Sequence, residues 1–168
     1  MGSATDGKHI YVAINNNNNV SYTLAPAHTV TVNAGSWAAL DPETGNIIWQ
    51  IPATGQDPTN PKLGAGAEGQ VSAAAGVVYA GSLSGDMVAM EGNSGAILWK
   101  FASGGSVICG PSIVNGTVFW ARDIALVRVT TSYLLSRSAK AMTASSKGTT
   151  SEILDNLAAG GRRNERGC

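Results

Sequence analysis

The fold of this chain is decided by residues 39–49, Ala39-Leu40-Asp41-Pro42-Glu43-Thr44-Gly45-Asn46-Ile47-Ile48-Trp49, because their pattern returns later in the sequence. Residues 89–99 read Ala89-Met90-Glu91-Gly92-Asn93-Ser94-Gly95-Ala96-Ile97-Leu98-Trp99. The shared pattern is A-x-[DE]-x-x-[ST]-G-x-x-x-W, displaced by 50 positions. Self-similarity at such a spacing is typical of repeat architectures. We therefore expect the chain to be built from repeated units.

A second pattern marks the start of each unit. A glycine followed by β-branched and aromatic residues occurs at 7–12, at 76–80 and at 116–120. Inside the first motif, the carboxylate can accept hydrogen bonds from backbone N–H groups two or three residues on, and the glycine supplies a position with positive φ. The dipeptide Asn115-Gly116 between two apolar runs predicts a two-residue hairpin. Each unit is therefore predicted to be a small antiparallel sheet.

The units differ in length. The second and third starts are 40 residues apart, whereas the first and second are 69 apart. Most of the additional residues fall between Tyr11 and Asp41 and between Trp49 and Gly76, which predicts two long loops in the first unit. Four-stranded sheets repeated at this length are typical of a β-propeller. We predict an all-β chain with two four-stranded sheets across residues 7–121 and the beginning of a third.

Composition divides the chain at residue 121. Eleven Lys and Arg balance eleven Asp and Glu over 168 residues, which argues against nucleic acid as a partner of the whole chain. All six arginines follow residue 121, whereas all four tryptophans precede it. We expect propeller blades at 1–121 and a divergent basic tail at 122–168, irregular or with a short helix across 151–159. No apolar run is long enough to predict a membrane span.

The motif A-x-D-x-x-T-G-x-x-x-W resembles the tryptophan-docking motif of pyrroloquinoline-quinone (PQQ) repeat propellers, the fold of quinoprotein alcohol dehydrogenases. Residues 35–41, 76–82 and 102–107 are most similar to polyvinyl-alcohol-dehydrogenase-like proteins of that superfamily. The resemblance covers about residues 2–121 and implies a partial quinoprotein-type β-propeller of about two and a half blades. Catalytic members of the family hold PQQ with a calcium ion, so these two cofactors are implied by the resemblance alone.

Two functions remain open at this point. The resemblance implies a part of a PQQ-dependent alcohol dehydrogenase of the polyvinyl-alcohol type that is inactive by itself. The alternative is a non-catalytic propeller scaffold for protein–protein contacts, which is favoured by the lack of a C-x-x-C-H haem motif and of a recognisable cofactor-binding cluster in the sequence. Repeats bury their faces against neighbouring repeats, so we expect the partners to be remaining propeller blades or further copies bound through open sheet edges.

No residue is assigned as catalytic, cofactor-binding or metal-binding from the sequence. Asp41 and Glu91 have the side chains of a calcium ligand or a catalytic base, but their place inside the turn motif favours a structural role. Trp49 and Trp99 have rings that could stack on a quinone. Docking between neighbouring blades is the favoured interpretation of both tryptophans.

Other candidate site residues are also interpreted as structural. His9 and His28 have no partner at a metal-ligand spacing. Cys109 stands in an apolar strand context and is interpreted as a small buried residue. The run Asn15–Asn19 is interpreted as a solvated loop, and Gly64-Ala65-Gly66 lacks the Lys-Ser/Thr that follows a phosphate-binding loop.

Overall fold

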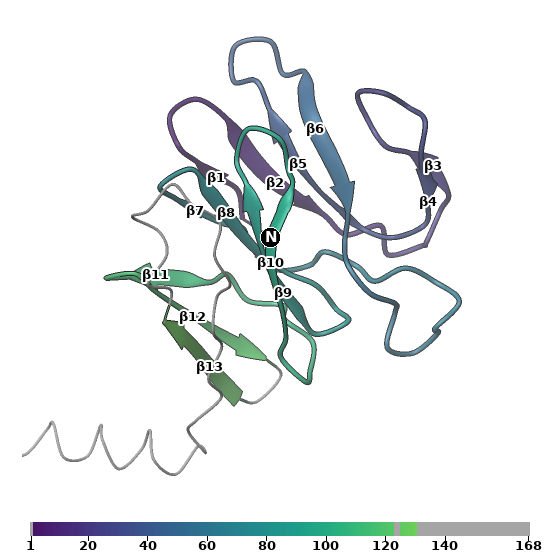
Figure 1. Cartoon of the computed structure of the whole chain (residues 1–168). Coiled ribbons are helices and arrows are strands. Elements are labelled where there is room, and N and C mark those ends of the chain that lie inside the picture. Colours follow the sequence, from purple (N-terminus) through teal and green to yellow (C-terminus); the bar gives the residue numbers. More distant parts are fainter. Residues whose placement is uncertain (1, 123–124, 131–168) are drawn as a thin grey trace, which may run out of the picture.

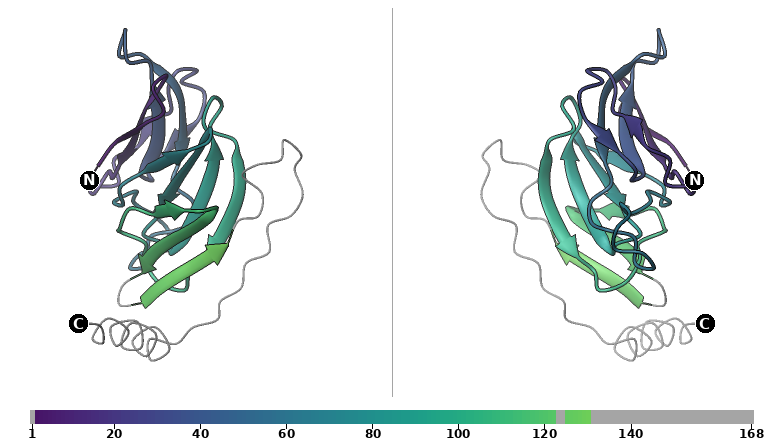
Figure 2. Two further views of the ribbon diagram at one scale, coloured as in Figure 1. Left: turned by 90° about the vertical axis from the view of Figure 1, so that its left-hand side faces the viewer. Right: turned by 90° about the vertical axis from the view of Figure 1, so that its right-hand side faces the viewer.

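The chain folds as a fan of antiparallel sheets in a computed structural model that describes residues 2–122 and 125–130, the latter by their backbone. Within these residues, strands are the only regular elements. Three sheets stand side by side, and a small hairpin lies beyond the outer strand of the first (Figure 1, Figure 2).

The strand order is the same in the two complete sheets, and the third begins in the same way. The first sheet contains, in spatial order, β1 (Ala4–Thr5), β2 (Ile10–Ile14), β5 (Ser36–Leu40) and β6 (Ile47–Pro52). The second contains β7 (Ser72–Ala74), β8 (Val77–Gly81), β9 (Asp86–Glu91) and β10 (Ile97–Ala102). The third contains β11 (Ser112–Val114), β12 (Thr117–Arg122) and β13 (Ala125–Thr130). The hairpin consists of β3 (Tyr22–Thr23) and β4 (Thr31–Val32).

The two repeated motifs occupy equivalent positions, as predicted. Trp49 on β6 is paired with Ala39 on β5, and Trp99 on β10 is paired with Ala89 on β9. A register irregularity stands directly beside each of these pairs, towards the turn. The prediction of two four-stranded antiparallel sheets is therefore confirmed down to the register of the tryptophans.

The third sheet begins with the predicted hairpin. Asn115 and Gly116 both have positive φ, 47° and 71°, and they connect β11 to β12. The backbone of β13 then pairs with β12 along its whole length, so this sheet continues beyond residue 121. The remainder of the expected tail, including the short helix predicted across 151–159, lies outside the described residues.

In the part of the chain that the structure describes, two hydrophobic clusters hold the sheets together, one on each face of the second sheet. Between the first and second sheets lie Tyr11, Trp37, Ala39, Trp49, Val78, Ala80, Val88 and Met90. Between the second and third sheets lie Tyr79, Met87, Ala89, Val107, Val118 and Trp120. Neighbouring residues of β8 and β9 enter opposite clusters because successive side chains of a strand point to opposite faces.

The asparagine run lies in the first long loop, where none of its residues is buried, and two of its side chains also organise the loop. Asn16 and Asn19 both adopt positive φ, 55° and 47°, and are half-buried. The Asn16 amide donates to the carbonyls of Val20 and Asn33 at 3.0 Å each. The Asn19 amide donates to the carbonyls of Asn33 at 3.1 Å and Gly64 at 3.2 Å. Asparagine tolerates left-handed backbone and can bond nearby carbonyls, so the run organises the loop.

The second long loop runs close against the first. A Cβ atom on Gly64 would collide with Ala34, and one on Gly66 would collide with the side-chain oxygen of Asn15. These glycines are therefore required by the close approach of two loops. The backbone bond from Gly35 N–H to the Ala65 carbonyl, at 2.9 Å, fixes the same contact.

Candidate functional site

The carboxylate of Asp41 is engaged inside the turn between β5 and β6. It accepts the backbone N–H of Glu43 at 2.9 Å and the hydroxyl of Thr44 at 2.8 Å. The N–H of Glu43 and then the Thr44 hydroxyl hold the pKa of Asp41 below its ordinary value, because both bonds favour the ionised form. The predicted bond to a backbone N–H two residues on is therefore confirmed.

Glu91 occupies the same place in the turn between β9 and β10. Its carboxylate accepts the side-chain amide of Asn93 at 2.8 Å. The Ser94 hydroxyl, followed by the N–H groups of Asn93, lowers the pKa of Glu91. No three His, Cys, Asp or Glu side chains within residues 2–122 gather closely enough to hold a metal ion. Each of the two motif carboxylates thus interacts with its own turn.

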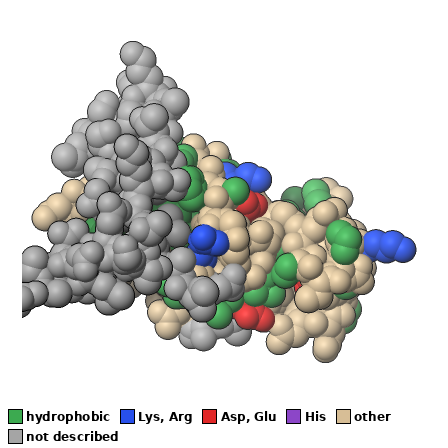
Figure 3. All heavy atoms as spheres, turned by 90° about the horizontal axis from the view of Figure 1, so that it is seen from below, with side chains coloured by type: hydrophobic (Ala, Val, Ile, Leu, Met, Phe, Trp, Pro, Cys, Tyr) green, Lys and Arg blue, Asp and Glu red, His purple; other side chains and the backbone are tan. Residues whose placement is uncertain are grey.

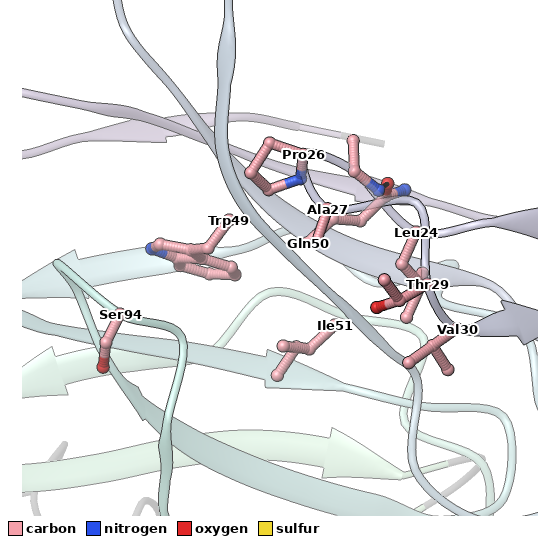
Figure 4. A pocket seen from close by; sticks show the side chains of 10 residues that line it. Leu24, Pro26, Ala27, Thr29, Val30, Trp49, Gln50, Ile51 and Ser94 are labelled. Carbon is pink, nitrogen blue, oxygen red and sulfur yellow. Dashed lines mark hydrogen bonds between the residues drawn. The ribbon is translucent and has the colours of Figure 1, made fainter.

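Trp49 joins the first sheet to the second. Its indole N–H donates to the carbonyl of Gly92 at 2.7 Å, and the side chain is buried. The ring lies against Gly95, where a Cβ atom would stand only 2.7 Å from the indole Cε3. Figure 4 shows the Trp49 ring between its own strand and the turn that carries Ser94. One tryptophan therefore contacts two glycines in the turn of the neighbouring motif.

Trp99 lies at the corresponding place between the second and third sheets. It is half-buried and stacks on Phe101, with ring centroids 5.9 Å apart. It also meets Trp120 edge to face at 6.1 Å. The turn that would follow in a third motif lies outside the described residues.

A polar cluster at the start of β2 was not singled out from the sequence. Asp6 accepts the N–H groups of Lys8 at 2.9 Å and His9 at 2.8 Å, and its other oxygen accepts the Tyr11 hydroxyl at 2.9 Å. Burial raises the pKa of Asp6, but the bonds from Lys8, His9 and Tyr11 outweigh it and hold this pKa well below the ordinary value. Burial, followed by the bond to Asp6, raises the pKa of the Tyr11 phenol. The Asp6-Gly7 dipeptide was the sequence signal for this turn.

Replacing Asp6 with asparagine should lower the midpoint of thermal unfolding by a few degrees at pH 7. The ionised carboxylate is stabilised by three donors in the folded state, so its contribution is fully present above a pH of about 4. It is lost as the pH falls through the lower folded-state pKa. The difference between wild type and Asp6→Asn should therefore shrink in acid, as measured by thermal unfolding at several pH values. A difference that grows in acid would contradict this assignment.

A groove lies beside the Trp49 contact, between β6 and the loop of the inserted hairpin. It has a volume of about 240 Å³ and is lined mainly by Leu24, Pro26, Val30, Trp49 and Ile51 (Figure 4). Gln50 also lines it, and its side chain accepts the N–H of Ala25 at 2.9 Å and donates to Ser36 at 2.8 Å. Sequence reasoning missed this groove because one wall is the inserted hairpin, which has no counterpart in the second unit.

Cys109 is not among the residues that line this groove, whereas His28 lies in the loop that forms one of its walls. Cys109 is half-buried, and its thiol bonds the N–H and carbonyl of Ala121 at 3.0 and 2.9 Å. His28 has positive φ and lies 3.3 Å from the Thr23 hydroxyl. On the underside of the molecule, hydrophobic and charged side chains of the described residues are scattered among polar surface (Figure 3). No helix within residues 2–122 and 125–130 could cross a membrane.

Comparison with known proteins places this architecture in a family. The family model described as outer membrane protein assembly factor BamB, PQQ_2, matches residues 33–149. The match runs past residue 121, where the composition changes. A comparison with curated protein sequences gave no match.

Solved structures share the fold. The crystal structure of BamB from Moraxella catarrhalis is 18% identical, with a TM-score of 0.52 over 76% of this chain and 36% of that one. A europium-containing methanol dehydrogenase is 16% identical, with a TM-score of 0.50 over 77% of this chain and 22% of that one. The chain thus spans about a third of the first protein and less than a quarter of the second.

Proposed function

Because this chain belongs to the PQQ-repeat family described as outer membrane protein assembly factor BamB, we propose that it is a propeller sector that makes protein–protein contacts. In this role its sheets provide surfaces for neighbouring blades and other proteins. By itself it does not oxidise alcohols.

The observation that carries this proposal is the contact of Trp49 with the next motif. The indole N–H bonds the Gly92 carbonyl, and the ring covers Gly95. This contact is expected of a tryptophan-docking motif, in which the tryptophan of one blade packs on the turn of the next blade. Such repeats contribute both a sheet and an interface to the assembly, and their stability depends on their neighbours.

The second candidate function is that of a PQQ-dependent alcohol dehydrogenase sector. The methanol dehydrogenase shares the fold at 16% identity. An identity this low supports similarity of fold and not of activity. The described residues do not fit a calcium-bound quinone, because Asp41 and Glu91 bond their own turns and no three metal-ligating side chains of residues 2–122 gather. We therefore assign no catalytic step to these residues.

The purified chain should not reduce a dye when it is given PQQ, calcium and secondary alcohols, polyvinyl alcohol included. Catalytic groups must be held within about half an ångström of their productive positions, which requires a complete pocket. Each missing hydrogen bond costs about 1–3 kcal/mol, so a sector that lacks several partners should bind the quinone poorly. The measurement is a titration of PQQ with calcium, followed by reduction of an artificial acceptor.

The control uses the two motif carboxylates. Saturable binding at micromolar PQQ, followed by dye reduction that Asp41→Ala or Glu91→Ala abolishes, would overturn the proposal. It would also show that these side chains act on a cofactor.

A further inference from the structure

Three side chains with different metal-binding atoms converge at the turn between β1 and β2. The Tyr11 hydroxyl oxygen lies 2.9 Å from Asp6 Oδ2 and 3.2 Å from His9 Nδ1. The third separation, between His9 Nδ1 and Asp6 Oδ2, is 3.5 Å. A carboxylate oxygen, an imidazole nitrogen and a phenol oxygen therefore form a small triangle, which we call the Asp6–His9–Tyr11 cluster.

The size of this triangle suits a first-row transition metal ion. Zinc binds imidazole nitrogen and carboxylate oxygen at about 2.0–2.2 Å. A triangle with these three sides has a point about 2 Å from each corner, slightly outside its plane. An ion at that point is within coordination distance of all three atoms.

The backbone holds the carboxylate of this cluster in place. Asp6 Oδ1 accepts the N–H groups of Lys8 at 2.9 Å and His9 at 2.8 Å, so Oδ2 is the oxygen available to an ion. Hydrogen bonds of this kind orient metal ligands. Tyr11 is 1% exposed, whereas the side chains of His9 and Asp6 are 14% and 24% exposed. The cluster is therefore anchored in the interior and accessible from solvent.

The surroundings of the cluster are acidic. Burial, followed by the hydrogen bond and charge of Asp6 and then the charge of Glu91, raises the pKa of the Tyr11 phenol. The N–H of Glu43 is the main cause that lowers the pKa of Asp41, and the charge of His9 also contributes. Within residues 2–122, no lysine or arginine forms an ion pair with Asp6, Asp41 or Glu91. A cation that enters the cluster is therefore attracted by nearby carboxylates and displaces no existing cationic side chain.

The second sheet shows that the fold does not require the complete cluster. Tyr79 stands on β8 where Tyr11 stands on β2. The five residues before Tyr79 include neither a carboxylate nor a histidine. Among the described residues, the Tyr79 hydroxyl has no hydrogen-bond partner. Asp6 and His9 are therefore additions to a tyrosine that the sheet accommodates without them.

We propose that Asp6 Oδ2, His9 Nδ1 and the Tyr11 oxygen bind zinc or another first-row divalent metal ion. On binding, the Tyr11 hydroxyl releases its proton to solvent and its phenolate oxygen bonds the metal. A water molecule completes the four-coordinate arrangement that zinc prefers. The ion links the turn 6–9 to β2 beside the second sheet, where a Cβ atom on Gly92 would stand 2.6 Å from the Tyr11 hydroxyl. This site is independent of the protein–protein contacts proposed above.

A zinc titration of the full chain, after treatment with a chelator, tests the proposal. We expect one zinc ion per chain to produce the ultraviolet difference absorption of a tyrosinate and to raise the midpoint of thermal unfolding. Tyr11→Phe should abolish the tyrosinate signal. Tyr11→Phe, Asp6→Asn and His9→Gln should each weaken zinc binding roughly tenfold or more, because changes beyond the ligands already cost about 10–100-fold in affinity.

Three variants outside the cluster serve as matched controls. Tyr79→Phe removes a buried hydroxyl, His28→Gln removes a histidine, and Asp57→Asn removes a carboxylate that bonds its own turn. Each control should bind zinc as tightly as the wild type and keep the tyrosinate signal. Equal zinc affinity in the cluster variants and the controls would overturn the proposal.

The unmodified chain provides a test that does not depend on the folding of any variant. Copper(II) in place of zinc should produce a phenolate-to-metal charge-transfer band in the visible range. Zinc binding without a tyrosinate signal, together with copper binding without this band, would show that Tyr11 is not a ligand and that the assigned site is wrong.

Discussion

Replacing Trp49 with alanine should lower the free energy of unfolding by about 4 kcal/mol, as expected for a large buried aromatic side chain. The indole is 6% exposed and packs in the cluster between the first two sheets. The substitution also leaves the buried Gly92 carbonyl without its donor. Small domains are stable by only about 5–15 kcal/mol, so the loss should be obvious in urea unfolding followed by circular dichroism.

Trp49→Phe separates the two contributions of this side chain. Phenylalanine keeps most of the apolar contact but cannot donate to Gly92, so we expect a loss of about 2 kcal/mol. If Trp49→Phe were as stable as wild type, the hydrogen bond to Gly92 would contribute nothing. If Trp49→Ala were equally stable, the indole would not join the sheets.

Replacing Gly95 with alanine should cost about 3 kcal/mol, although only one methyl group is added. Part of the cost is the left-handed backbone, which disfavours any Cβ atom. The larger part comes from the Trp49 ring, whose carbons lie 2.7 and 2.8 Å from the new atom and must move. Urea unfolding measures the loss, and quenching of tryptophan fluorescence should report greater access to Trp49.

Gly45→Ala is the matched control for this prediction. It introduces the same methyl group at nearly the same φ, but nothing lies within 4 Å of it. We therefore expect only the backbone cost, about 1 kcal/mol. Equal losses for the two variants would mean that the Trp49 ring does not rest on Gly95.

The features predicted well from the sequence are those that occur twice. The repeated motif predicted equivalent strand pairing in the two sheets. A carboxylate, a glycine and a tryptophan at constant spacing require the same turn and the same following strand each time. The pairs Ala39 with Trp49 and Ala89 with Trp99 are the direct result. The Asn115-Gly116 hairpin was predictable for a local reason, since both residues tolerate positive φ.

The features that escaped prediction occur once and depend on contacts distant in sequence. The hairpin of β3 and β4 has no counterpart to compare it with, so neither it nor the groove beneath it could be placed. The Asn16 and Asn19 amides meet Asn33 and Gly64, contacts that no local pattern contains. Likewise, Cys109, in the segment between β10 and β11, bonds Ala121 on β12 rather than serving only as a small apolar residue.

Among the described residues, the second sheet contributes to both hydrophobic clusters, whereas the first and third contribute to one each. In a linear array of this kind, each unit is stabilised by its own bonds and by the interfaces it shares with adjacent units. Of the interfaces between the described sheets, opening the first or third sheet breaks one, but opening the second breaks two. Among these sheets, hydrogen exchange should therefore be slowest along β8 and β9.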